Sequence, residues 1–181
     1  RMNKSDELSA YTIVNTYSEE KLSDILFQYG ELRNARALAA KIHEERQVEK
    51  IVTSFRLKEV LQQFLPKAKE HKILAQIFQA IRIEVNQELE VLKEFLIQAP
   101  KMLEVNGRLS VISYHSLEDR LVKRFIKNGQ FEGEPEKDFY GNIDVPMKNV
   151  GKMIIPTREE IKLNNRARSA KLRIATLNQK K

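Results

Sequence analysis

The stretch GRLSVISYHSLEDR, residues 107–120, decides the fold class of this chain. Its first eight residues favour a β-strand behind an Asn-Gly turn, and the adjacent apolar pair Val111 and Ile112 is typical of a strand buried on both faces. Ser116 can cap a helix over residues 117–125. With an amphipathic helix on either side of the strand, this unit predicts an α/β domain with a parallel sheet.

Downstream of this unit, the sequence predicts two more strands. Residues 129–150 are rich in Gly, Pro, Asn and acidic residues and predict a loop, and residues 152–156 predict a short strand. Thr157 and Glu160 can form a capping box before a short helix. Residues 171–177 alternate between polar and apolar side chains and predict the last strand.

Three strands with a parallel crossover make a poor sheet on their own. We therefore expect that part of the α/β domain lies outside this sequence. The alternative is that strands within residues 1–20, or strands mistaken for helices, have been missed.

Upstream of the unit, three short amphipathic helices predict a small all-α domain. Ser18 is an N-cap followed by acidic residues in the first turn, and Leu22, Ile25 and Leu26 follow at helical spacing. The second helix covers residues 32–46. The third helix is capped by Thr53 or Ser54 and ends before Pro66.

A long helix then covers residues 73–102, and we expect Pro100 to break or kink it. The stripe Gln79, Arg82, Asn86 and Glu90 shares one face of this helix. It could face a ligand or another domain. A solvated face with internal pairs, such as Arg82 with Asn86, is the commoner explanation.

Composition narrows the class of protein. The chain has 181 residues, of which 41% are hydrophobic and 31% charged, so it is foldable and soluble. It has no Cys and three His, so we expect no disulfide and no metal site. The apolar runs are too short for a bilayer, and nothing resembles a signal peptide. We expect a cytoplasmic protein without membrane partners.

The net charge of +7 is confined to the C-terminal region. Residues 141–181 hold ten basic and three acidic residues, and ten minus three is +7, so residues 1–140 balance at zero. A clustered basic stretch suits phosphate-rich partners. A merely solvated tail explains the composition equally well.

The densest polar cluster is Ser113 to Arg120, at the carboxyl end of the predicted strand, where open α/β sheets place their ligands. His115 can exchange a proton near neutral pH, and Glu118 and Asp119 can accept hydrogen bonds from an amine or a hydroxyl. A capping pair of Ser116 with Asp119 is the structural alternative for those two residues.

The basic run near the C-terminus leads straight into the last strand. Arg166 and Arg168 precede it, and Lys171 and Arg173 project from one face of it, which suits contacts to phosphates. Protection of a sheet edge by charge is the alternative. Between positions 31 and 50 the sequence has many charged side chains, including Arg46. We expect them to form a solvated face, and contact with RNA is the less favoured option.

Four blocks in order along almost the whole chain resemble the bacterial 16S ribosomal RNA cytosine-N4 methyltransferases, the ribosomal RNA small subunit methyltransferase H family. They are residues 14–20 (VNTYSEE), 78–86 (FQAIRIEVN), 112–125 (ISYHSLEDRLVKRF) and 166–173 (RARSAKLR). Three short stretches depart from the family pattern. The Pro-Gly-Gly turn is Val-Asn-Gly at 105–107, the His-Pro-Ala-Thr-Arg stretch is His-Lys-Ile-Leu-Ala at 71–75, and the Asn-Pro pair is Asn-Asn at 164–165.

The resemblance implies a class I S-adenosylmethionine-dependent methyltransferase, a Rossmann-like α/β sheet domain with an inserted small all-α domain. Residues 1–72 would be the helical inserted domain with its entry linker, and residues 73–181 the C-terminal part of the α/β domain. The chain would start partway through the protein. It has no counterpart of the glycine-rich first strand and turn that hold the cofactor, or of the fourth strand with its catalytic motif.

The implied reaction is N4-methylation of a cytosine in the decoding region of 16S ribosomal RNA, with the base unpaired or flipped. The chain alone would be inactive and would not bind S-adenosyl-L-methionine, and the step needs no metal. The partner would be 16S ribosomal RNA in the small ribosomal subunit, and exposed strand edges would allow a homodimer. A non-enzymatic RNA-binding or adaptor module that uses the basic C-terminal region is the alternative.

The resemblance also suggests roles for individual residues. The candidates for lining the catalytic pocket are His115, Ser116 and Glu118. The candidates for RNA binding are Arg82, Asn86, Arg166, Arg168, Lys171 and Arg173.

Overall fold

The computed structural model describes residues 8–141 and 143–178. The chain divides into two compact units, the first ending at Glu88 and the second beginning at Leu89. The sequence places the end of an inserted domain between residues 72 and 73. That boundary refers to the architecture of a larger protein, so it stays a prediction.

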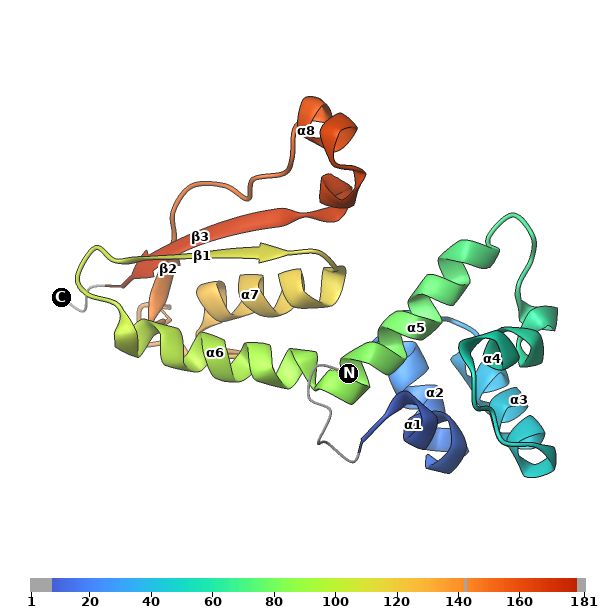
Figure 1. The fold of residues 1–181 in the computed structure, drawn as a ribbon. Coiled ribbons are helices and arrows are strands. Elements are labelled where there is room, and N and C mark those ends of the chain that lie inside the picture. The colour runs from blue at the N-terminus through green and yellow to red at the C-terminus, as the bar shows by residue number, and fades with distance from the viewer. Residues whose placement is uncertain (1–7, 142, 179–181) are drawn as a thin grey trace. The chain divides into compact units, whose positions relative to one another are not determined.

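The first unit is helical in its described part (Figure 1). Its elements are α1 (Ala10–Thr16), α2 (Glu19–Gln28), α3 (Ala35–Val48), α4 (Ser54–Val60), the 3-10 helix η1 (Gln62–Phe64) and α5 (Glu70–Asn86). Fully buried side chains from these helices form its core, among them Leu22, Leu26, Leu38, Ile42 and Ile77. The all-α character predicted from the helical spacing is confirmed.

Hydroxyl side chains begin three of these helices. The side chain of Ser18 accepts a hydrogen bond from the backbone N–H of Lys21, and that of Thr53 accepts one from the N–H of Arg56. Both caps were predicted, because a hydroxyl at the N-cap satisfies an N–H that lacks an intrahelical partner. Helix α1, capped by Ser9, was not predicted.

Two buried polar side chains fasten the first unit internally. The Asn15 side chain exchanges two hydrogen bonds of 2.9 Å with the backbone of Ile51. Arg46 donates to the carbonyl oxygens of Val14 and Tyr17, at the C-terminal end of α1. The expectation of a solvated face is wrong for Arg46, which is buried, and burial lowers the pKa of its guanidinium. Both side chains satisfy backbone groups that would otherwise be buried without partners.

The long helix predicted over residues 73–102 is two helices. Helix α5 ends at Asn86, and α6 runs from Glu88 to Met102. The break falls at Gln87, whose φ of 49° lies in the left-handed region. The expected break at Pro100 is wrong, since this proline lies inside the last turn of α6.

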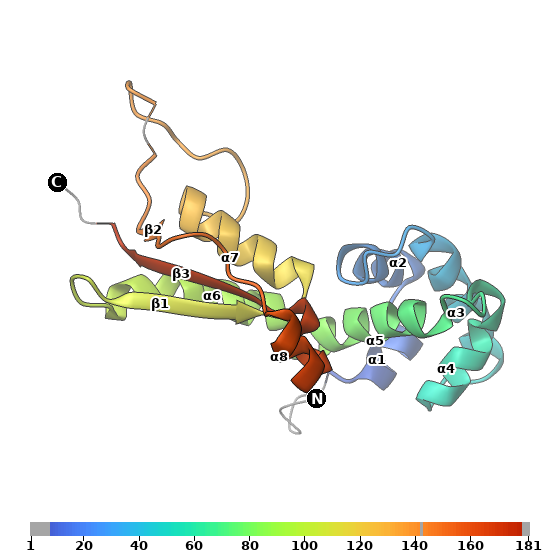
Figure 2. The same ribbon diagram turned by 90° about the horizontal axis from the view of Figure 1, so that it is seen from above.

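The second unit combines helices with a three-stranded sheet (Figure 2). Its elements are α6, β1 (Arg108–Ser113), α7 (Ser116–Asn128), β2 (Met147–Asn149), α8 (Arg158–Leu163), the 3-10 helix η2 (Asn165–Ser169) and β3 (Lys171–Leu177). The strand order is β1-β3-β2, and β3 pairs antiparallel with both neighbours.

This topology confirms an α/β unit and corrects two strand predictions. Both strand pairings are antiparallel, whereas the sequence predicted a parallel sheet. The expected strand at residues 152–156 is wrong, because there only Ile154 makes an isolated bridge, to Leu172. The second strand lies instead at Met147–Asn149, within the predicted loop.

One face of the sheet is covered by α6 and α7. Leu109, Met147 and Ala175 from the strands form one buried cluster with Leu96 of α6 and with helix α7. On the other face of β1, Ile112 is 57% exposed. The prediction that both faces of β1 are buried is therefore wrong for the described residues.

Within the described residues, none of the helices has both the length and the apolar character needed to cross a membrane.

Candidate functional site

The carboxyl end of β1 leads directly into helix α7 through Tyr114 and His115. His115 is the N-cap, with extended φ and ψ of −132° and 164°. Its Nδ1 accepts a hydrogen bond from the backbone N–H of Glu118 at 3.4 Å, and the Glu118 carboxylate accepts one in return from the backbone N–H of His115 at 3.3 Å. This reciprocal arrangement is a capping box with an imidazole in place of the usual hydroxyl.

The alternative capping pair, Ser116 with Asp119, is wrong by one residue. His115 itself has extended φ and ψ and is the N-cap, so Ser116 is already the first residue of the helix. Asp119 lies beyond the capping position and is buried at 7% exposure. The sequence predicts a cap and a partner three residues apart, but it does not single out His115 as the capping residue.

Glu118 holds the turn together. Its Oε2 also accepts from the backbone N–H of Tyr114 at 2.8 Å, and its Oε1 lies 3.1 Å from Nε2 of His115. Burial alone would raise the pKa of Glu118, but the hydrogen bonds from His115 and from the Tyr114 backbone outweigh burial and hold the pKa below its usual value. Glu118 is therefore ionised at neutral pH and acts as an acceptor.

Asp119 binds two cations from the last strand. Arg173 approaches side-on, with Nε 2.7 Å from Oδ1 and Nη2 3.2 Å from Oδ2, and Lys171 Nζ lies 3.2 Å from Oδ2. Burial would raise the pKa of Asp119, but these hydrogen bonds and charges outweigh it and lower the pKa. This cluster, Asp119–Lys171–Arg173, ties the first turn of α7 to β3.

The Asp119–Lys171–Arg173 cluster was not predicted, although the sequence carries a signal for it. Lys171 and Arg173 alternate on one face of a strand, as predicted, and the register places them opposite Ser113 and Val111. That face is the one covered by α7, so a carboxylate in the first turn of α7 is within reach. Edge protection by these two cations is wrong for the described sheet, because β3 is its central strand.

The four basic candidates near the C-terminus therefore differ in their surroundings. Lys171 and Arg173 meet Asp119, and the Arg173 side chain is only 14% exposed. Arg166 and Arg168 lie on η2 and are exposed. Among residues 8–141 and 143–178, neither of these two arginines forms an ion pair, so both guanidinium groups face solvent.

Arg82 and Asn86 belong to the first unit. Arg82 makes a two-point contact with the Glu88 carboxylate at 2.9 and 3.0 Å, and the Asn86 side chain donates to the same carboxylate at 2.9 Å. The predicted stripe does not act as one group. Gln79 donates to the Tyr29 carbonyl, and Glu90 pairs with Lys93.

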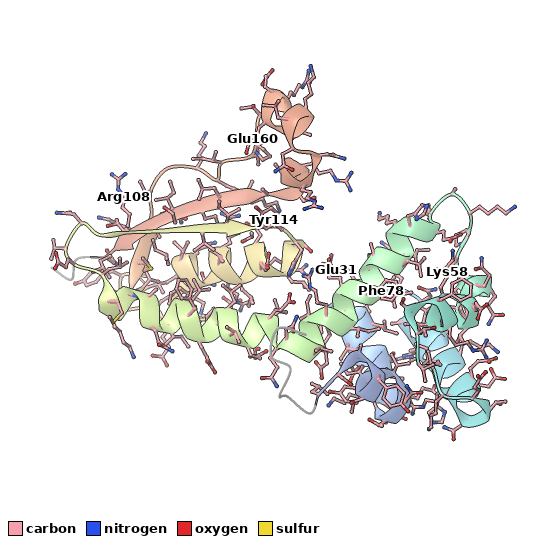
Figure 3. All side chains as sticks on the ribbon, in the orientation of Figure 1. Glu31, Lys58, Phe78, Arg108, Tyr114 and Glu160 are labelled. Carbon is pink, nitrogen blue, oxygen red and sulfur yellow. The ribbon has the colours of Figure 1, made fainter. Side chains whose placement is uncertain are left out.

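Arg82 and Asn86 also border a pocket of about 410 Å³ on α1 and α5. Its walls include two partly exposed rings, Tyr11 (49%) and Phe78 (38%). Figure 3 shows the Phe78 side chain on α5 and Tyr114 where β1 ends. A pocket with aromatic walls suits a flat ring that can stack on them, while the Arg82 guanidinium at its rim is paired with Glu88.

The part of the chain that the structure describes contains no group of three or more His, Asp or Glu side chains arranged to hold a metal ion.

The chain is similar to known proteins over nearly its whole length. It is 66% identical over 175 residues to ribosomal RNA small subunit methyltransferase H of Flavobacterium psychrophilum, and the match covers 97% of this chain and 60% of the relative. The protein of that name from Flavobacterium johnsoniae is 63% identical over 97% of this chain and 58% of its own length. The one from Phocaeicola vulgatus is 52% identical, again over 97% and 58%.

The chain thus spans about 60% of the length of these curated relatives. The sequence profile of the MraW methylase family matches residues 1–178. This match covers almost every residue described above, including β1, α7, η2 and β3 with their charged side chains. The chain therefore belongs to the MraW methylase family.

Proposed function

We propose that this chain is the C-terminal portion of a methyltransferase that modifies N4 of a cytosine in 16S ribosomal RNA within the small ribosomal subunit. The observation that carries the proposal is the family match over residues 1–178, together with relatives named ribosomal RNA small subunit methyltransferase H. The strand order β1-β3-β2, with a reversed central strand and both α6 and α7 on one face, is compatible with the end of a Rossmann-like sheet.

In this proposal, S-adenosylmethionine supplies the methyl group and is held by a part of the protein outside this chain. A class I methyltransferase binds it at a glycine-rich turn after the first strand, and residues 1–181 hold no such motif. The residues of this chain do not fit that cofactor cradle, so we assign them to the RNA substrate only.

The exocyclic amine of cytosine is a poor nucleophile, because its lone pair is delocalised into the ring. A protein can help by holding the amine in line with the methyl donor and by accepting hydrogen bonds from its N–H groups. His115, Ser116 and Glu118 follow the carboxyl end of β1, where this fold places ligands. We propose that they line the pocket for the base, with Glu118 keeping the turn rigid.

The RNA backbone is proposed to meet the exposed arginines. Arg166 and Arg168 present unpaired guanidinium groups on the described surface of η2, which suits phosphate recognition. On the first unit, the pocket beside Arg82 and Asn86 offers Tyr11 and Phe78 for stacking on an unpaired base.

Calorimetry on this chain alone tests where the cofactor is held. We expect no saturable heat when S-adenosylmethionine is titrated into the chain. Tight one-to-one binding would show that these 181 residues contain a cofactor site and would contradict the division of labour proposed here.

The second candidate function is an RNA-binding or adaptor module without enzymatic activity, and the exposure of Arg166 and Arg168 favours it. It predicts that this chain alone binds small-subunit RNA, with an affinity that falls steeply as salt rises. A second experiment joins this chain to the part of a relative that it does not match. RNA binding by the chain without methyl transfer by the joined protein would favour the adaptor over the enzyme.

A further inference from the structure

The connection between α7 and β2 carries an ordered turn that projects two aromatic rings into solvent. Lys137 and Ile143 form an isolated antiparallel bridge. Inside it, Asp138 accepts hydrogen bonds from the backbone N–H of Tyr140 at its side chain and of Gly141 at its carbonyl, both at 2.9 Å. Gly141 has a φ of 82°, a left-handed conformation that suits glycine. We name residues 137–141 the hairpin tip.

The two rings at the hairpin tip are almost completely exposed. Phe139 is 98% and Tyr140 85% exposed, and neither belongs to a described core cluster. Their centroids lie 5.6 Å apart with the planes at 89°, an edge-to-face pair. Single exposed apolar residues are ordinary, but here two adjoining rings form one exposed aromatic patch on a hydrogen-bonded turn.

The loop that carries the rings has a net charge opposite to that of the whole chain. Residues 129–146 contain five acidic residues and one lysine, so one minus five gives −4 in a chain of +7. All five acidic residues are exposed, and three of them, Glu132, Glu134 and Glu136, precede the hairpin tip. Phosphates would be repelled here, whereas cations are attracted both to carboxylates and to the faces of aromatic rings.

We propose that the hairpin tip, with Phe139 and Tyr140 at its centre, docks a basic, arginine-rich polypeptide segment of a partner protein. Guanidinium groups stack flat on aromatic rings and also pair with carboxylates, so they match both features of this surface. The proposal does not depend on the methyl-transfer function. It assigns protein binding to the hairpin tip and leaves RNA binding to the basic surface proposed at η2.

The test is a titration of an octa-arginine peptide into the 181-residue chain, followed by calorimetry at low salt. We expect the double variant F139A/Y140A to bind the peptide about tenfold more weakly than the unchanged chain, because it has no ring on which a guanidinium can stack. We expect the triple variant E132Q/E134Q/E136Q to weaken binding as well and to reduce its dependence on salt. Thermal unfolding of F139A/Y140A should match that of the unchanged chain, since both rings lie outside the core.

The matched control is F27A/F55A, which removes two aromatic rings of the first unit that are 62% and 67% exposed. It should leave peptide binding unchanged. Equal peptide affinity for F139A/Y140A and the unchanged chain would overturn the proposal. Binding of an unpaired oligouridylate is measured as well. If F139A/Y140A weakens oligouridylate binding but not peptide binding, the proposal is overturned in favour of an RNA partner.

Discussion

Asp119 shows at the scale of one residue what the folded chain adds to the sequence. Its neighbours His115 and Glu118 were identified as a polar cluster, and Asp119 was considered only as an acceptor or as part of a cap. In the structure it is a buried carboxylate held by Arg173 and Lys171, more than fifty positions away in sequence. Such a pairing depends on strand register, which a local pattern cannot supply.

We predict that Asp119 and Arg173 are energetically coupled. D119N leaves a largely buried guanidinium without its counter-charge and should lower the free energy of unfolding by about 3 kcal/mol. R173M should cost less than D119N, because Lys171 still pairs with Asp119, and the double variant D119N/R173M should cost less than the sum of the two. Denaturant unfolding of the four proteins measures the coupling. Strictly additive losses would show that the ion pair makes no net contribution.

The same carboxylate gives a pH dependence with a defined sign. The folded pKa of Asp119 is lowered, so its contribution to stability is complete above its unfolded pKa of about 3.9 and is lost as pH falls through the folded value. Urea unfolding at a series of pH values below about 5 should show a steeper acid loss in the unchanged chain than in D119N. The exposed carboxylate Asp24 supplies the control, and D24N should keep the acid loss of the unchanged chain.

At the scale of the element, the sequence predicts helix starts that depend on a nearby capping residue. It does not predict how strands far apart in the sequence pair. Ser18 and Thr53 cap their helices because a hydroxyl meets a backbone N–H three residues on. The alternation of residues 171–177 identified β3, and the apolar run identified β1. The direction in which these strands pair is set by tertiary packing, so the antiparallel sheet was missed.

Besides α1, the sequence does not predict strand β2 or the helix break at Gln87, because neither carries a distinctive signal. Strand β2, Met147–Asn149, has three residues without alternation and pairs only because β3 lies beside it. The helix break at Gln87 involves neither glycine nor proline. Gln87 is the C-cap of α5 and has a left-handed φ. The sequence predicts that Pro100 breaks or kinks the helix, but α6 continues through Pro100 to Met102, so the helix is not broken there.

The imidazole cap of α7 makes a prediction about the candidate site. H115A removes an N-cap acceptor and should lower the free energy of unfolding by about 1 kcal/mol. H115N keeps a good capping side chain and should stay close to the unchanged chain in stability. Chemical denaturation measures both.

These two variants also separate the cap from a role in the substrate pocket. If His115 contacts the base, H115N in the whole enzyme should lose methyl transfer although its stability is kept. Full activity of H115N would reduce His115 to a capping residue and remove it from the catalytic candidates.

At the scale of the whole molecule, the structure sorts the basic residues into two kinds. The sequence placed the excess of +7 in residues 141–181 and treated Arg166, Arg168, Lys171 and Arg173 as one group. Lys171 and Arg173 bind Asp119, although the Lys171 side chain is still 37% exposed, whereas Arg166 and Arg168 are exposed without an ion pair among the described residues. Charge counting could locate the basic region, but it could not tell which of its cations have a carboxylate partner.

This division predicts which substitutions affect RNA binding. R166A/R168A should reduce the slope of log affinity against log salt by about 1 for each phosphate that the variant no longer binds, with unfolding unchanged. The control K123A/K127A removes the same charge from the exposed side of α7 and should change the slope much less. Filter binding to small-subunit RNA at several salt concentrations distinguishes them. Equal slopes for both double variants would mean that η2 does not bind phosphates.

The central claim is that this chain supplies the RNA-facing, C-terminal portion of a cytosine-N4 methyltransferase. The most direct measurement joins residues 1–181 to the part of the Flavobacterium psychrophilum relative that this chain does not match, which we propose to be its N-terminal part. The purified chimera is given S-adenosylmethionine and small ribosomal subunits that lack the modification, beside the unaltered relative as a positive control. Mass spectrometry of the digested 16S ribosomal RNA should then show N4-methylcytidine at one position. A folded chimera that binds S-adenosylmethionine but transfers no methyl group, or that methylates a different atom, would contradict the account.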